Sequence, residues 1–166
     1  MAASEKIVTL KDLVARLEKI RTTGKKLVFT NGCFDLLHVG HVRYLAEAKS
    51  QGDLLVVGLN SDDSVRMIKG DKRPIVGQDN RAEVLAALAS VDYVVIFDEP
   101  DPLRLIQTIQ PDVLVKGEDW AADAIIGARE VKSWGGRIVR VSFVEDASTT
   151  GLIQAILQRH RGDLGE

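Results

Sequence analysis

The sequence predicts a Rossmann-like α/β fold, with a doubly wound parallel sheet of about five strands in a single domain spanning residues 1–166. Short, nearly continuous apolar runs indicate strands that are covered on both faces, and amphipathic segments of helical periodicity alternate with them. A length of 166 residues fits one compact domain and leaves little room for a second. We expect an N-terminal helix at about 9–23, followed by a core at about 26–160.

The N-terminal helix has recognisable ends. Thr9 can cap it, with Asp12 three residues on and apolar residues at helical spacing, and Gly24 follows as a stop signal. The elements expected next are a strand at 27–30, a helix at 40–50 and a strand at 54–59. The polar stretch at 60–80 should hold a short helix and then a mobile loop.

The alternation resumes after this stretch. Asp101 can cap a helix whose first position is Pro102, and Ser148 can cap a last helix that carries an apolar face. The expected elements are a helix at 81–89, a strand at 93–97, the helix after Asp101, a strand at 113–116, a helix at 123–134, a strand at 138–141 and the helix after Ser148. Because strands that alternate with helices form parallel sheets, ligands should bind beyond the carboxyl ends of the strands.

Charge and composition exclude several classes of protein. Lys and Arg number 22 and Asp and Glu number 24, and this net charge of −2 leaves no positive excess for a nucleic-acid partner. No apolar run approaches the roughly 20 residues that cross a bilayer, and the chain does not open with a secretory signal. Cys33 is the single cysteine, so no internal disulfide can form. We therefore expect a cytoplasmic protein without a membrane or nucleic-acid partner.

The segment that follows the first strand, residues 31–41, carries the strongest chemical signal. Gly32 allows close backbone approach, and Gly40 lies near a helix start whose free amides favour an anion. His38 and His41 are three residues apart, so a helical turn directs both imidazoles the same way. A phosphate beside them could keep the imidazoles protonated as donors.

Other interpretations of these histidines stay open. Each can be an ordinary packing or surface residue, and together they could form half of a metal site. The third histidine, His160, lies far along the chain and there is no second cysteine, so a zinc site would have to use carboxylates. The segment lacks the G-x-G-x-x-G spacing of dinucleotide-binding proteins, which argues against a dehydrogenase.

Residues 32–41 resemble the H-x-G-H signature of the nucleotidyltransferase superfamily, in its cytidylyltransferase-like group. The resemblance extends over nearly the whole chain from about Lys26. It implies that His38 and His41 donate to the α- and β-phosphates of a nucleotide, and that Asp35 orients the acceptor or the metal. The other nucleotide-binding residues implied in this segment are Asn31, Gly32, Phe34 and Gly40.

The basic stretch Lys69-Gly-Asp-Lys-Arg-Pro74 resembles the family's loop that closes on the triphosphate and the acceptor. The resemblance implies that Lys69 clamps the acceptor phosphate and the α-phosphate, with Lys72 as the alternative. It also implies that Arg73 binds substrate and that Arg81 contacts phosphate. A solvated surface loop is the other interpretation of this basic stretch.

Two later segments complete the implied site. Residues 116–120 resemble the family segment that faces the base and ribose, although a capping turn stabilised by Trp120 would explain them equally well. Residues 148–150 resemble the last nucleotide motif, where hydroxyls and amides hold the triphosphate, and an N-cap is compatible with that role. The residues implied to bind the nucleotide are Lys116, Gly117, Asp119, Trp120, Ser148, Thr149 and Thr150.

The residues before Ser148 narrow the implied reaction. Members of the family that use CTP place an arginine there, whereas this chain has Glu145-Asp-Ala147. Within the family, the chain most resembles adenylyltransferases that convert ATP and heptose 1-phosphate into ADP-heptose and pyrophosphate for lipopolysaccharide core biosynthesis. The resemblance implies Mg²⁺ held through phosphates without direct protein ligands, a homodimer, and a functional link to a heptose kinase.

Two alternative functions remain at this point. One is a CTP-dependent cytidylyltransferase that acts on glycerol 3-phosphate or a similar alcohol phosphate. The other is a catalytically silent nucleotide-binding module, although both histidines and the lysine loop are more than binding alone requires.

Overall fold

The computed structural model describes residues 2–118, 121, 124–142 and 148–160. The strands are β1 (Leu27–Gly32), β2 (Leu54–Asn60), β3 (Tyr93–Phe97), β4 (Val113–Gly117) and β5 (Arg137–Val141). The helices are α1 (Ala3–Lys6), α2 (Leu10–Arg21), α3 (Val39–Ser50), α4 (Asp62–Lys69), α5 (Gln78–Ala87), α6 (Leu103–Ile109), α7 (Ala128–Ser133) and α8 (Thr149–Arg159).

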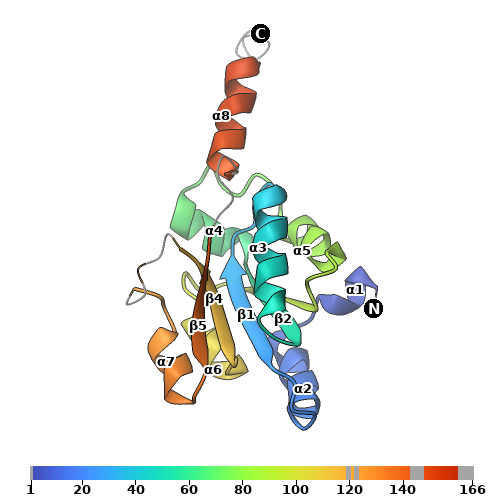
Figure 1. Ribbon diagram of the computed structural model, residues 1–166. Coiled ribbons are helices and arrows are strands. Elements are labelled where there is room, and N and C mark those ends of the chain that lie inside the picture. The colour runs from blue at the N-terminus through green and yellow to red at the C-terminus, as the bar shows by residue number, and fades with distance from the viewer. Residues whose placement is uncertain (1, 119–120, 122–123, 143–147, 161–166) are drawn as a thin grey trace.

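The strands form one five-stranded sheet in the order β3-β2-β1-β4-β5, and every pairing is parallel. Helices cover both faces of this sheet (Figure 1). Helices α3 and α5 bury Leu45 and Leu85 on one face, whereas α2, α6 and α7 bury Leu13, Ile106 and Val131 on the other. The predicted fold class, a doubly wound parallel α/β sheet, is therefore confirmed.

Local signals place most helix ends as predicted. The Thr9 hydroxyl accepts a hydrogen bond from the amide of Asp12 at 3.1 Å, and Gly24 adopts a φ of +73° shortly after α2 ends. The carboxylate of Asp101 accepts a hydrogen bond from the amide of Leu103, and Ser148 caps α8 through the amide of Gly151. Pro102 occupies the N-cap of α6 rather than its first helical position.

Two helices differ from the predicted ranges. Helix α5 begins at Gln78, whereas the predicted start is 81. The sequence does not indicate the earlier start, because the first turn of the helix is polar and gives no apolar periodicity. Helix α7 begins at Ala128 rather than 123, since Gly127 precedes it in the left-handed conformation at a φ of +84°. The structure also contains two features that the sequence patterns do not indicate, helix α1 and an isolated parallel β-bridge between Ile7 and Val94.

Helix α8 extends away from the rest of the molecule, beyond the carboxyl edge of the sheet (Figure 1). None of its residues is buried. Its predicted apolar face is therefore largely exposed, at 41% for Leu152, 55% for Ile156 and 50% for Leu157. Within the described residues, no helix is both long and apolar enough to cross a bilayer.

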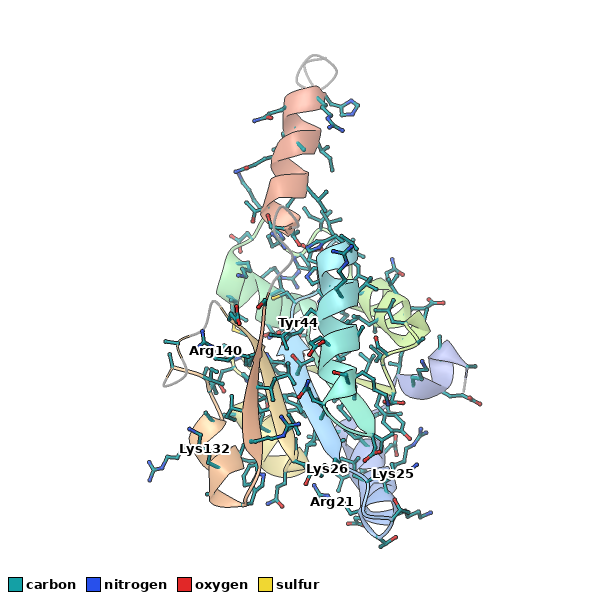
Figure 2. All side chains as sticks on the ribbon, in the orientation of Figure 1. Arg21, Lys25, Lys26, Tyr44, Lys132 and Arg140 are labelled. Atoms are coloured by element: carbon teal, nitrogen blue, oxygen red, sulfur yellow. The ribbon has the colours of Figure 1, made fainter. Side chains whose placement is uncertain are left out.

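A buried hydrogen-bond network under the carboxyl edge joins α3 to the sheet. Tyr44, labelled in Figure 2, donates from its hydroxyl to the carbonyl of Val115 at 3.2 Å. The Thr30 hydroxyl lies 2.7 Å from the Tyr44 hydroxyl oxygen, and it donates to that oxygen because the Tyr44 proton is used on Val115. This network ties α3 to both β1 and β4.

Replacing Tyr44 with phenylalanine should lower the free energy of unfolding by about 1–2 kcal/mol, because both hydrogen bonds are lost in a buried place. Urea unfolding of the Tyr44→Phe variant measures this loss. Tyr93→Phe is the matched control, since the Tyr93 hydroxyl makes no hydrogen bond within the described residues. Equal losses in the two variants would show that the network contributes no stability.

Candidate active site

A cavity of about 400 Å³ lies at the carboxyl edge, where the strand order reverses between β1 and β4. These two strands pair only at Val28 with Val113 and at Phe29 with Leu114. Nearer the carboxyl edge the two strands are no longer paired, and the ammonium of Lys116 on β4 donates to the side-chain oxygen of Asn31 on β1. Open parallel α/β sheets bind ligands at such a reversal point, so the cavity lies where the sequence predicts the ligand.

The structure brings most of the predicted site residues to this cavity. The wall contains Asn31, Gly32, Phe34, Asp35, His41, Lys69, Arg73, Lys116, Gly117, Thr149 and Thr150. Five predicted residues do not line it: His38, Gly40, Lys72, Arg81 and Ser148. Asp119, Trp120 and the acidic stretch 145–147 lie outside the described residues.

The loop between β1 and α3 folds tightly over the end of the sheet. Phe34 and Leu36 both adopt positive φ angles, at +46° and +47°, which non-glycine residues rarely do. The Phe34 ring covers Gly32, where a Cβ atom would lie 3.0 Å from a ring carbon. The same ring meets the imidazole of His41 edge to face at 5.4 Å. Gly32 therefore makes room for the ring that supports His41.

The two histidines lie against each other at the start of α3, with ring centroids 3.9 Å apart. Nδ1 of His38 accepts a hydrogen bond from the amide of Gly40 at 3.2 Å, and Nδ1 of His41 accepts one from the amide of His38 at 3.4 Å. In neutral rings these bonds leave the proton on Nε2. Each histidine therefore presents an Nε2–H donor.

Both imidazoles of the pair have lowered pKa values, so their protonation would require the phosphate that the sequence-based expectation places beside them. Burial lowers the pKa of His38. Burial, with a smaller contribution from His38, lowers the pKa of His41 to about 4. Both rings are therefore neutral at pH 7 in the ligand-free chain, and they offer donors without carrying a full charge.

The depressed pKa of His41 predicts a pH-dependent stability. Unfolding restores a pKa near 6.5, so the unfolded state binds the additional proton, and stability is lost as the pH falls from about 6 to 4. This group should change the free energy of unfolding by at most about 1.4 kcal/mol per pH unit, the value for one whole proton. Urea unfolding across this range should give a flatter profile for His41→Gln, whereas the exposed control His160→Gln should match the wild type. An unchanged slope in His41→Gln would contradict the assignment.

The structure separates the two candidate lysines of the basic stretch. Lys69 is the last residue of α4 and lines the cavity, and its ammonium makes no hydrogen bond or ion pair with any described residue. Lys72 lies further along the loop, is exposed and does not line the cavity. The geometry favours Lys69 over Lys72 as the cation that meets a ligand.

Arg81 lies behind the cavity wall, which differs from the expected contact with phosphate. Its guanidinium donates to the carbonyls of Cys33, Asn60 and Val76 and pairs with the carboxylate of Asp62 at 2.7 Å. The side chain is 1% exposed. Arg81 therefore holds together the loops that form the site.

Asp35 also differs from its expected role. Its side chain is 0% exposed, and both carboxylate oxygens accept hydrogen bonds from the loop that follows α4. Burial alone would raise the pKa of Asp35, but the amides of Ile75 and Val76 and the guanidinium of Arg73 outweigh it and lower the pKa. A carboxylate engaged in this way does not face an acceptor or a metal ion directly.

The start of α8 reaches the cavity with hydroxyls and free amides. Ser148 uses its hydroxyl as the N-cap and stands outside the cavity wall, whereas Thr149 and Thr150 line it. The Thr149 hydroxyl donates to the carbonyl of Asp35 at 2.8 Å. The N-terminus of this 11-residue helix is thereby held beside the β1–α3 loop, where its amides favour an anion.

Several cavity residues were missed by the sequence analysis. Asn60 ends β2 at the carboxyl edge, and Tyr44 follows His41 by three residues on α3, so strand ends and helical spacing could have indicated both. Residues 100–102 and Ile126 bring mainly apolar surface from loops. No local pattern marks those loop residues as part of a site.

This fold and site define a nucleotidyltransferase-type protein. His41 of the H-x-G-H turn, Lys69 and the N-terminus of α8 surround one cavity at the reversal point of a parallel sheet. The chain belongs to the cytidylyltransferase-like family, whose model matches residues 29–155. The family predicted from the sequence is confirmed.

Curated relatives at high identity carry the name bifunctional protein HldE. The relative from Geobacter metallireducens is 56% identical over 155 residues, which is 93% of this chain and 32% of that protein. The relative from Geotalea uraniireducens is 58% identical over 151 residues, covering 91% of this chain and 31% of that protein. The chain thus spans about a third of the length of these relatives.

Solved structures support the same fold. The lipopolysaccharide core biosynthesis protein from Thermoplasma volcanium superposes with a TM-score of 0.62 at 30% identity, over 73% of this chain and 99% of that one. A pantoate-beta-alanine ligase from Francisella tularensis, at 18% identity, gives a TM-score of 0.60 over 92% of this chain and 78% of that one. The second likeness bears on the fold alone.

Proposed function

We propose that this chain transfers AMP from ATP to a heptose 1-phosphate and so forms ADP-heptose and pyrophosphate for lipopolysaccharide core biosynthesis. The observation that carries the proposal is the set of phosphate-directed donors around one cavity: His41, Lys69 and the start of α8. Identity of 56% to a bifunctional protein HldE supports the proposal, as does the likeness to a lipopolysaccharide core biosynthesis protein.

In the proposed reaction, an oxygen of the acceptor phosphate attacks the α-phosphorus of ATP in line. A new P–O bond forms while the bond from the α-phosphorus to the bridging oxygen breaks, and that oxygen leaves with pyrophosphate. No covalent intermediate on the protein is required. Cys33 suits no such role, because burial raises the pKa of its thiol. The residues need to position the reactants and stabilise the charge on the phosphates.

The donor set also bears on the proposed Mg²⁺ ion. His41, Lys69 and Arg73 bring hydrogen-bond donors and positive charge to the cavity, which suit phosphate oxygens rather than a bare cation. Mg²⁺ would therefore enter with the nucleotide and be held through its phosphate oxygens, where it neutralises charge.

Release of pyrophosphate tests this proposal. The chain is mixed with Mg²⁺ and either ATP or CTP, each with heptose 1-phosphate or glycerol 3-phosphate as acceptor. Release with ATP and heptose 1-phosphate alone is the expected result. Release with CTP would favour the cytidylyltransferase alternative. A nucleotide-dependent rise in melting temperature without release from any pairing would favour a binding module.

We also propose that the enzyme is a cytoplasmic homodimer that works together with a heptose kinase. The exposed apolar face of α8 supports a homodimer, because an exposed apolar patch commonly marks an interaction surface. The bifunctional relatives are about three times as long as this chain, so they have room for a second domain, and we propose a functional link to a heptose kinase that supplies the sugar phosphate. A small-molecule nucleotide reaction and the single cysteine fit a cytoplasmic enzyme without nucleic-acid or membrane partners.

A further inference from the structure

The buried carboxylate of Asp35 organises the loop between α4 and α5. One oxygen lies 2.5 Å from Nε of Arg73, and the amides of Ile75 and Val76 donate to the carboxylate at 2.9–3.1 Å. Donors that lie 38–41 residues further along the chain therefore converge on one side chain. A charged hydrogen bond of this kind is short and directional, so it fixes the orientation of the guanidinium.

The bond to Asp35 engages only one edge of the Arg73 guanidinium. Arg73 lines the cavity, and its side chain is 17% exposed. Its terminal nitrogens make no hydrogen bond or ion pair within the part of the chain that the structure describes. A guanidinium has five N–H donors in a rigid plane, so these nitrogens can still grip two oxygens of a phosphate.

A second contact links the same residue to the start of α8. The carbonyl of Asp35 accepts the hydroxyl of Thr149 at 2.8 Å, while its carboxylate holds Arg73. Asp35 thus fixes the position of a helix N-terminus and of an arginine at one cavity. In the proposed reaction the phosphates of ATP have His41 and the N-terminus of α8 as donors at the cavity. The acceptor phosphate needs cations of its own, and Arg73 is available beside Lys69.

We infer that Asp35 is a positioning residue: by holding Nε of Arg73, it directs the terminal nitrogens of Arg73 to the phosphate of the acceptor, within the substrate role that the family resemblance implies for Arg73. This inference rests on the proposed function, since it takes a phosphorylated acceptor as the ligand. It gives Asp35 an indirect role in place of a contact with acceptor or metal. It also assigns the loop's phosphate contact to its arginine in addition to Lys69, and not to Lys72.

Steady-state kinetics with ATP and heptose 1-phosphate test the assignment. Arg73→Gln should raise the KM for the acceptor by about 10- to 100-fold, because a charged pair of hydrogen bonds is lost. Arg73→Lys keeps the charge without the planar fork and should recover only part of this loss. The KM for ATP should stay within about threefold of the wild type in both variants. An increase confined to the KM for ATP would overturn the inference.

The indirect role of Asp35 predicts a non-additive double variant. Asp35→Asn should raise the KM for the acceptor by about tenfold. The variant with both Asp35→Asn and Arg73→Gln should be no worse than Arg73→Gln alone, because Asp35 acts through Arg73. Additive effects would show that Asp35 has a separate role. If Asp35→Asn fails to fold, the Arg73 variants still decide, since that side chain is partly exposed.

A binding measurement separates this inference from the proposed function. Inorganic phosphate is titrated calorimetrically into the chain after a non-hydrolysable ATP analogue, α,β-methylene-ATP, has occupied the nucleotide site. Phosphate should bind the wild type and the control Arg66→Gln, which alters an arginine of α4 outside the cavity. Binding should weaken at least about tenfold in Arg73→Gln. Equal affinity in Arg73→Gln, or no binding to the wild type, would contradict the inference. This result does not depend on whether heptose 1-phosphate is the acceptor.

Discussion

Replacing His41 with alanine should lower kcat by about 10²–10³-fold while the fold stays intact, because a preorganised donor to a reacting phosphate contributes about that much. The structure supports this size of effect in two ways. Nδ1 of His41 is occupied by the amide of His38, which leaves Nε2–H as the donor, and the ring lies in the cavity wall against Phe34. The donor is therefore oriented before any ligand arrives.

Steady-state rates and thermal unfolding of the His41→Ala variant check this expectation together. His160→Ala is the matched control, since that histidine follows α8 away from the cavity, and its rate should equal that of the wild type. If His41→Ala retains nearly full activity, then His41 takes no part in the mechanism.

Replacing Lys69 with alanine should lower kcat/KM by about 10²–10³-fold, with a large rise in the KM for the acceptor. Lys69 ends α4 at the cavity wall, where its ammonium can meet both the α-phosphate and the acceptor phosphate. Lys72 lies outside the cavity wall, so Lys72→Ala should lower kcat/KM far less than Lys69→Ala.

Kinetics of both lysine variants with each substrate varied in turn measure this difference. Lys25→Ala serves as control, because Lys25 lies at the end of the molecule opposite α8 (Figure 2). Equal and small effects at Lys69 and Lys72 would mean that the basic stretch is a solvated surface loop.

The strands were predictable because each is a short apolar run between polar residues. The range 93–97 matches β3 at both ends, since Asp92 and Asp98 border the run. The start of α5 was not predictable in this way, because its first turn carries only polar residues. The start of α7 depends on the backbone conformation of Gly127, which no periodicity reveals.

The candidate site could be predicted only in part, for a related reason. Its motifs are local, and the position of each after a strand or at a helix start was enough to bring them to one edge. The contacts of Asp35 and Arg81 instead join residues that are 38 and 48 positions apart. Sequence patterns could show that both residues are charged, but only the folded loops reveal that they hold backbone and side chains rather than phosphate.

Transfer of label from ATP carrying ³²P in the α-phosphate tests the central claim most directly. With Mg²⁺ and heptose 1-phosphate, the label should move into ADP-heptose, and no product should form when the sugar phosphate is omitted. Label that remains in ATP, or that appears only as AMP, would contradict adenylyl transfer at this cavity.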